Sequence, residues 1–473
     1  MSRTMNWTLI STLPLLLLGL TQNSAADPLQ IGSEDRSSVA LTLYNQNIGL
    51  VREERRLPPL RKNQQVTLED VSAKLQIQSL RISNAGPILE QNLNTNLLNQ
   101  QSLLQHYVGK QLRLARLNPV TGQEVLSQVK LINIEGNRAL INREGRFESI
   151  PLNNQWRFIF PSLPEKLLIK PSLTFRSEGT ARAQDANISY LSGGMNWSMN
   201  YVLTLNKAGN RVDLDGLASL SNQTGTDFHQ AKINLLAGEL YQPQNRSQYR
   251  KQGVEMMRAM SADAAPAPKQ EGLQDFHLYN LPRKTDLLHG QVKQVSLITA
   301  TNIPVERLYD YQFLVYPSIE RNQHRVKPEL LVKLTNDKKS QLGMPLPAGE
   351  LRTFSPDSQN QLQFIGGSNI NHTGKNDELE VRLGKAFDVS IHRKQTHFSK
   401  TFNGHLVSQE LRISNSRNTP AKINLTANFP LAWTMKQSSH PHQKIQGGSA
   451  RWQIEVPANG DSVLSFSVQM DKR

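Results

Sequence analysis

The sequence predicts a mainly β protein built from antiparallel β-sandwich domains, with a small β-barrel module and one short helix towards the N-terminal side. Two observations carry this prediction. Apolar and polar side chains alternate through most of the chain after residue 26, as strands with one buried face require. Turn-forming Asn, Asp and Gly residues interrupt the alternation at strand-like spacing. The clearest alternating runs are residues 39–43, 199–205, 379–383, 423–427, 452–456 and 464–470.

The first 26 residues carry the features of an export signal peptide. Arg3 precedes an apolar run over residues 9–20, and Ser24, Ala25 and Ala26 place small side chains where a signal peptidase cuts. The apolar run is shorter than the roughly 20 residues that span a bilayer. We therefore expect cleavage near Ala26, no transmembrane anchor, and a mature protein in the periplasm or outside the cell.

Residues 27–165 are expected to form an N-terminal β region that contains the helix and the barrel. Apolar residues recur at helical spacing in a segment rich in Gln and Asn, which places the helix at about residues 93–108. Several short runs separated by tight turns follow this segment. Such a series of short strands predicts the small barrel at about residues 109–160.

Residues 166–395 are expected to form a central β-sandwich that is interrupted by a flexible linker over residues 240–273. The linker lacks strand patterning and is rich in Gln, Arg, Met, Ala and Pro. It fits an insertion within one sandwich as well as a boundary between two. Residues 396–473 contain enough short strands for a C-terminal immunoglobulin-like sandwich, without the cysteine pair of antibody domains.

Charge and cysteine content narrow the chemistry and the partners. The chain has 54 Lys and Arg against 39 Asp and Glu, and removing residues 1–26 takes away only Arg3, so the mature chain keeps 53 minus 39, or +14. This excess favours anionic surfaces through long-range electrostatics. Outside the cytoplasm the expected partner is another envelope protein or an anionic surface polymer, and not nucleic acid. The absence of cysteine excludes disulfides, thiol nucleophiles and thiolate metal sites.

The densest basic segment lies between residues 52 and 62. Its cations are interrupted by Glu53 and Glu54, so we interpret the segment as a solvated surface rather than an anion site. The cations concerned are Arg52, Arg55, Arg56, Arg61 and Lys62.

Five segments carry the most distinctive motifs of the chain. They are residues 43–51, 104–110, 190–201, 220–239 and 343–389. Together they resemble exported bacterial proteins of domain-of-unknown-function family 4139, and the likeness spans most of the mature chain. The resemblance implies an exported, β-rich architecture with a discontinuous domain. Because that family has no assigned activity, it supplies no catalytic residues.

Two of these motifs have a physical interpretation as structural features. Gly193 and Gly194 precede Trp197, and we interpret them as a bend that lets the aromatic ring cover a sandwich core. Pro345, Pro347 and Gly349 punctuate another segment as a shaped turn between strands would. A mobile glycine-rich edge that admits a ligand is the alternative.

A search for motifs with known chemistry assigns no catalytic, cofactor-binding or metal-ligating residue and no cofactor. The GxSxG elbow, the P-loop and HExxH are absent from the sequence. The weaker candidates are scattered hydrolase residues, a histidine pair around Pro441, a histidine group, and soft methionine ligands for copper. The hydrolase candidates are Asp213, Asp227 and His229, and the histidine pair is His440 and His442. The histidine group is His392, His397 and His405, and the methionines are Met256, Met257 and Met260.

Three classes of function fit these observations. We favour an exported, non-enzymatic protein of the cell envelope that binds a protein or a surface polymer through loops or strand edges. The alternative is an exported hydrolase that acts on envelope polysaccharide or peptide. A metal-handling protein is the third class. The sequence does not predict the oligomeric state.

Overall fold

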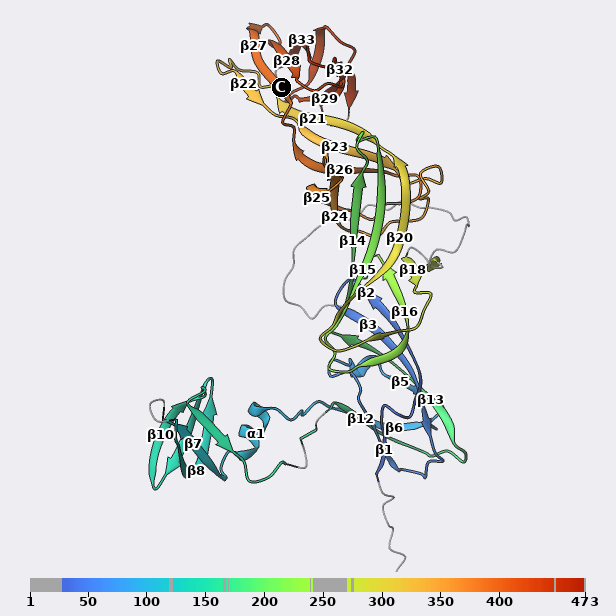
Figure 1. Ribbon diagram of the computed structural model, residues 1–473, viewed down its shortest axis with the longest axis vertical. Helices are drawn as coiled ribbons and strands as arrows, with labels where there is room; N and C mark the ends of the chain where they lie inside the picture. The colour runs from blue at the N-terminus through green and yellow to red at the C-terminus, as the bar shows by residue number, and fades with distance from the viewer. Residues whose placement is uncertain are drawn as a thin grey trace, which may run out of the picture. The chain divides into compact units, whose positions relative to one another are not determined.

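The structure is a computed structural model, and strands make up most of what it describes. The expected leader and nearly all of the expected linker, including the three linker methionines, lie outside the described residues. The mainly β fold is confirmed, with α1 (Gln100–Tyr107) as the one α-helix among the described residues and η1 (Ile77–Ser79) as a 3₁₀ turn (Figure 1). The described residues are 28–118, 122–164, 167–168, 170–238, 240, 270–273, 276–445 and 448–471.

The chain forms two compact units, and each is discontinuous in sequence. Unit 1 comprises Met1–Ser37, Arg55–Val71 and Ile82–Asn187. Unit 2 comprises Ser38–Glu54, Ser72–Arg81 and Ile188–Arg473. The units are described separately below.

Unit 1 contains a four-stranded sheet in which β1 runs parallel to β4 and the other neighbours are antiparallel. Alternate side chains of its strands are buried, for example Val66 and Leu68 on one strand and Leu173 and Phe175 on its neighbour. This is the period-two pattern expected of a sheet with one covered face. In sheet order the strands are β1 (Leu29–Ile31), β4 (Gln65–Glu69), β12 (Ser172–Ser177) and β6 (Ile88–Asn94).

Arg55 is a fully buried cation in unit 1. Its guanidinium donates hydrogen bonds to the carbonyl oxygens of Ile31 (3.3 Å), Gly32 (3.2 Å), Glu69 (2.6 Å) and Asp70 (3.4 Å). Buried carbonyl groups need donors, and one planar guanidinium supplies several at once. Arg55 thereby fixes the ends of β1 and β4.

The prediction of a solvated basic segment is therefore wrong for Arg55. Strand β3 (Ile48–Leu57) alternates between buried and exposed positions, so Arg55 lies on the buried side and Arg52 and Arg56 on the exposed side. Arg61 and Lys62, beyond the end of the strand, are also exposed.

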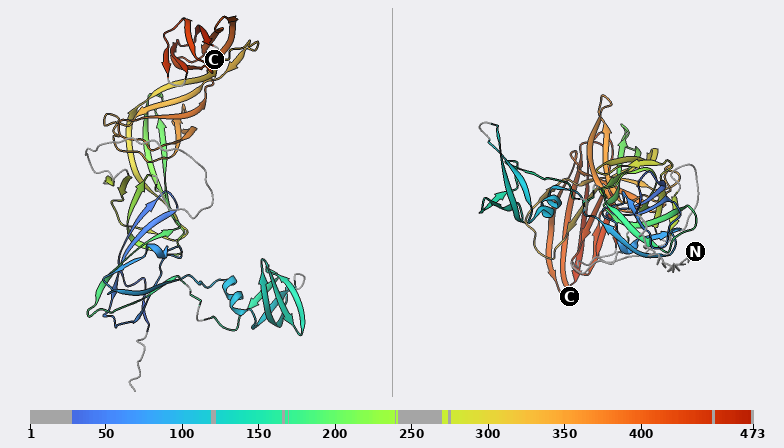
Figure 2. Two further views of the ribbon diagram at one scale, coloured as in Figure 1. Left: turned by 180° about the vertical axis from the view of Figure 1, so that it is seen from behind. Right: turned by 90° about the horizontal axis from the view of Figure 1, so that it is seen from below.

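A second part of unit 1 is a five-stranded antiparallel sheet with α1 beside it (Figure 2). Leu104 and Tyr107 of the helix belong to the same buried apolar cluster as Leu114 and Ile141 of the sheet. In sheet order the strands are β10 (Arg146–Pro151), β9 (Arg138–Arg143), β8 (Glu124–Glu135), β7 (Gln111–Leu117) and β11 (Trp156–Ile159).

This module differs from the expectation in two ways. The sheet is open, because its edge strands β10 and β11 pair only with β9 and β7, so the described residues form no closed barrel. In a closed barrel, strands of the opposite wall would fill the apolar cluster. Here the helix contributes to that cluster instead. The helix is also shorter than about 93–108. It begins after Asn99, whose side-chain oxygen accepts a hydrogen bond from the Ser102 amide, and β6 already uses residues up to Asn94.

Two further sheets carry most of the first half of unit 2 (Figure 1). The first includes the parallel pair of β16 with β2, and the second includes the parallel pair of β14 with β24. The first has the order β17 (Gln270–Leu273), β18 (Phe276–Asn280), β16 (Phe228–Ala237), β2 (Arg36–Tyr44), β3, β13 (Gln184–Gly193) and β5 (Arg81–Ser83), with β19 (Thr285–Leu287) also paired to β16. The second has the order β20 (Val292–Pro304), β15 (Arg211–Asn222), β14 (Met195–Leu205), β24 (Gly349–Pro356) and β25 (Leu362–Ile370).

The glycine, aromatic and proline motifs form part of this framework. Trp197 is buried, and its indole N–H donates to the carbonyl of Leu236 at 3.0 Å. The hydroxyls of Tyr201 and Tyr279 donate to the carbonyls of Pro347 and Pro345, both at 2.8 Å. Burial raises the pKa of both phenols, so they stay protonated donors.

Gly349 shows why this framework tolerates little change. A Cβ at that position would lie 2.2 Å from the carbonyl oxygen of Met199 on the parallel neighbour β14. Gly194 has φ of 82°, in the region that favours glycine. A Cβ added at this position would lie 2.8 Å from the Gln223 carbonyl oxygen. Both glycines therefore serve close packing of the backbone.

The C-terminal part of unit 2 is a sandwich of two sheets. Side chains from both sheets form one buried cluster that includes Phe313, Ile391, Leu411, Trp452 and Phe466. One sheet has the order β26 (Glu378–Lys385), β23 (Glu329–Thr335), β21 (Glu306–Leu314), β29 (Ala421–Asn428), β32 (Ser449–Val456) and β31 (Gln443–Ile445). The other has the order β22 (His324–Val326), β27 (Val389–Thr401), β28 (Gly404–Asn415), β33 (Gly460–Asp471) and β30 (Trp433–Ser438).

This sandwich draws on strands from well before residue 396. The domain boundary expected there falls inside β27, and the sandwich already includes β21, which begins at Glu306. Local patterning could not reveal this, because β21 pairs in parallel with β29, more than a hundred residues later in the chain.

Three buried asparagines end strands of unit 2 in the same way. Asn222 ends β15, Asn336 follows β23, and Asn415 ends β28. Each donates through Nδ2 to at least two backbone carbonyls and accepts a backbone N–H through Oδ1. Asn222 donates to the carbonyls of Thr226 and Leu287 and accepts from the Thr224 amide. Asn336 donates to the carbonyls of Met344 and Gly374 and accepts from the Gly343 amide. Asn415 donates to the carbonyls of Thr419 and Pro457 and accepts from the Arg417 amide.

Replacing Arg55 with methionine should destabilise unit 1 strongly. The substitution keeps much of the side-chain volume but removes the Arg55 donors from the carbonyls of Ile31, Gly32 and Glu69, whereas the Asp70 carbonyl still accepts from Arg36 Nη2 at 2.9 Å. Each buried polar group left unpaired costs about 1–3 kcal/mol. We expect a loss of at least about 3 kcal/mol in the urea unfolding of the mature chain. The matched control is Arg56→Met on the exposed side of the same strand, where a change within about 0.5 kcal/mol is expected. Equal effects of the two substitutions would contradict the structural role of Arg55.

Asn415→Ala should destabilise the C-terminal sandwich by about 1–3 kcal/mol, because a backbone amide and two carbonyls lose their partner. Asn418 lies three residues later with an exposed side chain, so Asn418→Ala is the control and should shift the unfolding free energy by less than about 0.5 kcal/mol. Thermal unfolding followed by circular dichroism measures both. A neutral Asn415→Ala would show that water replaces the side chain without cost.

Candidate functional site

The residues considered for a hydrolase do not converge. Asp213 accepts a hydrogen bond from the Asn302 amide at 2.7 Å, near the start of β15. Asp227 accepts one from the His289 amide at 2.7 Å, just beyond the other end of β15. At about 3.3 Å per residue, the stretch of β15 from Asp213 to its end at Asn222 spans roughly 30 Å. His229 lies on β16, two residues after Asp227, and its Nδ1 is 3.8 Å from Asp286 Oδ2. Asp227 and His229 therefore lie near each other, and Asp213 lies apart from both.

The histidines are also engaged separately. His440 Nδ1 lies 2.9 Å from the Ser439 hydroxyl, and the His442 ring lies near the rings of Trp433 and Trp452. His405 stacks on Phe398, while His392 and His397 are exposed on β27. No group of three or more His, Asp or Glu side chains within the described part of the chain is arranged to hold a metal ion.

A hollow of about 530 Å³ lies in the C-terminal sandwich, beside β21, β22, β23 and β26. It forms where the ladder between β21 and β23 stops at Asp310 while β21 continues to Leu314. We call it the basic hollow. Its lining residues are Asp310, Tyr311, Gln312, Arg325, Val326, Lys327, Glu329, Arg382 and Lys385.

Strand register brings the cations of the basic hollow together. Arg325 lies on β22 and Lys327 just after it, and Arg382 and Lys385 lie on β26. The pairing of β23 with β26 places Glu329 opposite Lys385, which joins the two segments. Only Arg382 has an anionic partner here, the Glu329 carboxylate at 2.8 Å.

Three cations of the hollow remain open to solvent. Arg325, Lys327 and Lys385 are exposed and form no ion pair with any residue that the structure describes. Asp310 is the other carboxylate in the lining. Its partial burial raises its pKa, although a hydrogen bond from Gln312 and the charges of Arg451 and Arg382 act in the opposite direction. The lining therefore carries a net positive charge.

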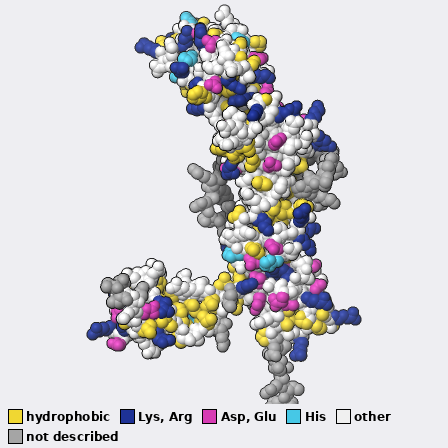
Figure 3. Space-filling model, viewed as in Figure 1, with side chains coloured by type: hydrophobic (Ala, Val, Ile, Leu, Met, Phe, Trp, Pro, Cys, Tyr) yellow, Lys and Arg dark blue, Asp and Glu magenta, His cyan; other side chains and the backbone are white. Residues whose placement is uncertain are grey.

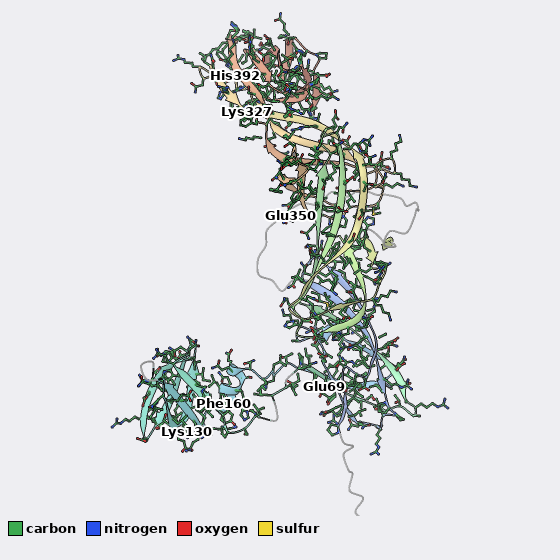
Figure 4. All side chains as sticks on the ribbon, viewed as in Figure 1. Glu69, Lys130, Phe160, Lys327, Glu350 and His392 are labelled. Atoms are coloured by element: carbon green, nitrogen blue, oxygen red, sulfur yellow. The ribbon has the colours of Figure 1, made fainter. Side chains whose placement is uncertain are left out.

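Lys327 connects the basic hollow to an exposed aromatic ring. Its Nζ donates to the carbonyl oxygen of Phe387 and lies 5.9 Å from the centroid of the Phe387 ring. Figure 4 labels Lys327 where β22 leads into β23. Phe387 is 89% exposed, in the turn between β26 and β27.

An ion network around the buried Arg393 holds the loop that precedes β22. Arg393 is buried and its Nη2 lies 2.8 Å from Glu320 Oε1, which also lies 2.7 Å from His324 Nε2. Gln395 accepts from the Glu320 amide at 2.8 Å and donates to the Ser318 carbonyl at 2.9 Å. These contacts attach the loop to β27, so we interpret the network as structural.

The electrostatics of Glu320 agree with this role. Partial burial alone would raise its pKa, but the hydrogen bond with His324 and the charge of Arg393 outweigh burial and lower the pKa of the carboxyl. Glu320 therefore remains an anion that balances the buried guanidinium. A hollow of about 520 Å³ adjoins it, lined only by the loop itself, from Tyr316 to Asn322.

One weak signal for the basic hollow is present in the sequence and was not among the features predicted from it. Arg325 and Lys327 alternate around Val326, the pattern of a strand that presents cations on one side. The other half of the hollow lies more than fifty residues later, so only the register of β23 with β26 identifies the site.

Comparison with known families gives one match. The model of the family "Domain of unknown function (DUF4139)" matches residues 186–471. The chain belongs to this family. The match includes the basic hollow and the motif segments 190–201, 220–239 and 343–389, whereas the segments 43–51 and 104–110 lie outside it. No curated protein matches the chain.

The described residues contain no helix whose length and apolar character would suffice to cross a membrane. The chain also contains no cysteine.

Glu320→Gln should destabilise the sandwich by about 1–3 kcal/mol at pH 7, less than a fully buried pair because Glu320 is partly exposed. A lowered carboxyl pKa contributes stability above the unfolded-state pKa, and that contribution is lost as the pH falls through the folded-state pKa. The difference between wild type and variant should therefore shrink between pH 7 and pH 3 in urea unfolding.

The control for this prediction is Glu410→Gln. Glu410 forms a comparable 2.8 Å ion pair with Lys394 on the same sandwich, but that lysine is largely exposed. We expect a change below about 1 kcal/mol for the control. A larger effect at Glu410 than at Glu320 would refute the role assigned to the buried network.

Proposed function

We propose that this chain is an exported, non-enzymatic protein of the cell envelope that binds an anionic surface polymer at the basic hollow. The observation that carries the proposal is the group of exposed cations, Arg325, Lys327 and Lys385, that share one concave site without ion-pair partners among the described residues. Export is supported by the pattern of residues 1–26.

The shape and charge of the hollow favour a polymer over a protein partner. The cores of protein–protein interfaces are depleted of charged residues, whereas charged side chains make up most of this lining. Arg325 can hold a carboxylate, sulfate or phosphate through two parallel hydrogen bonds, and the lysines act as point charges beside it. A chain of regularly spaced anions can meet all three cations at once.

The distribution of charge over the surface supports capture of such a polymer. Lys and Arg side chains are spread over the visible face of the protein (Figure 3). A general positive field increases the rate of encounter with polyanions, but it does not fix where they bind. The basic hollow supplies the concave site at which cations from two strands converge.

Reversing two charges of the hollow tests the proposal. The double variant Arg325→Glu with Lys385→Glu should bind dextran sulfate about tenfold more weakly at low salt, equivalent to about 1.4 kcal/mol. The control is Lys400→Glu with Lys436→Glu, which changes the net charge equally at exposed positions of the same sandwich. Fluorescence titration of the mature chain, with neutral dextran as the second ligand, measures the affinities.

The control variant should lose less than about twofold in affinity if binding is local, because exposed charges far from the polymer are screened by salt. Equal losses in both double variants would mean that the polymer binds diffusely, and the basic hollow would then not be the site. Cell fractionation tests export. A full-length chain that stays in the cytosol would contradict the proposed export.

A further inference from the structure

We infer that the polymer recognised at the basic hollow is an acidic glycan, one of whose sugar rings stacks on Phe387. The inference rests on the proposed function and narrows its ligand from polyanions in general to polysaccharides with acidic groups. It starts from the position of Phe387, which lies two residues after Lys385 of the lining and against Lys327.

The exposure of Phe387 is the first observation. Its side chain is 89% exposed, although the neighbouring residues Ala386 and Val389 are buried in the sandwich. Leaving a phenyl ring in water forgoes the hydrophobic stabilisation that burial would give. Single exposed apolar residues are common on protein surfaces, so exposure alone does not indicate a site.

The position of Lys327 is the second, independent observation. Its Nζ donates to the Phe387 carbonyl, which ties this turn to a lysine of the lining, and lies 5.9 Å from the ring centroid. A cation at this distance interacts with the negative face of the ring. An aromatic face thus lies next to Lys327 of the lining and two residues after Lys385.

This combination suits the two chemical parts of an acidic sugar. One face of a pyranose ring consists of C–H groups, which pack on the negative face of an aromatic ring and bury apolar area. The carboxylate or sulfate projects from the edge of the same sugar, where it can reach a lysine at the rim. A polyphosphate has the charge but no such face, so Phe387 should contribute to binding of the glycan alone.

The test compares Phe387→Ala with Phe402→Ala in the mature chain. Phe402 is 97% exposed in the turn between β27 and β28, so it matches Phe387 in exposure and lacks the contact with Lys327. The probes are polygalacturonate, inorganic polyphosphate and vesicles of phosphatidylglycerol. Phe387→Ala should weaken binding of polygalacturonate about fivefold to tenfold and change binding of polyphosphate by less than twofold. Phe402→Ala should change neither.

Two further variants separate a flat ring from general apolar character. Phe387→Trp should keep or strengthen binding of polygalacturonate, whereas Phe387→Leu should weaken it as alanine does. Equal binding of polygalacturonate by wild type and Phe387→Ala overturns the inference, as does an equal loss for polyphosphate. A loss confined to the vesicles also overturns it, since that result assigns Phe387 to lipid.

The charge-reversal variant distinguishes failure of this inference from failure of the proposed function. If Arg325→Glu with Lys385→Glu weakens binding of both polymers while Phe387→Ala weakens neither, the hollow binds polyanions and only the stacking is wrong. If the charge reversal changes the binding of no probe, the proposed function itself fails.

Discussion

The structure of unit 2 depends on satisfying backbone polar groups where strands end inside the protein. A strand is paired along its length, but the loop that follows it exposes carbonyl and amide groups to a low-dielectric interior. Asn222, Asn336 and Asn415 meet this requirement with the same chemistry, each following a serine or threonine in the sequence. A single amide side chain offers two donors and an acceptor, which lets a sharp change of direction remain buried. The recurrence of this arrangement indicates that successive parts of unit 2 are built on one structural plan.

Strands that end in this way bury alternate side chains along most of their length. Few positions in such a core bring polar side chains together. Side chains inside the sandwich are closely packed, and those along its strands are separated by the pleat. Irregularities therefore become the informative positions. The basic hollow lies at one of them, where β21 continues past the end of its ladder with β23, and the loop behind it is held by Glu320 and Arg393. The site follows from a mismatch in strand length rather than from a motif.

Each of the six alternating runs found in the sequence lies in a strand, because one-sided burial needs no knowledge of the partner strand. The runs at 199–205 and 464–470 lie in β14 and β33. Prediction failed at positions whose structure depends on a segment far away in the sequence. Leu93 fits helical spacing, yet it lies in β6 because β12, some eighty residues later, pairs with it. Arg55 lies in a charged segment and is buried, because the carbonyls that need its donors come from β1 and the end of β4. Neither outcome is encoded locally.

The same distinction separates the family motifs from the candidate site. Tyr201, Pro345, Pro347 and Gly349 are visible in the sequence because close packing and buried hydrogen bonds restrict which residues fit there. The cations of the basic hollow face solvent, where many residues fit, so no motif marks them. In this arrangement the motif residues hold the fold and exposed side chains form the proposed binding surface. The ligand can then change while the fold stays the same. In the proposed function, the motif residues hold the frame and the exposed cations of the basic hollow bind the ligand.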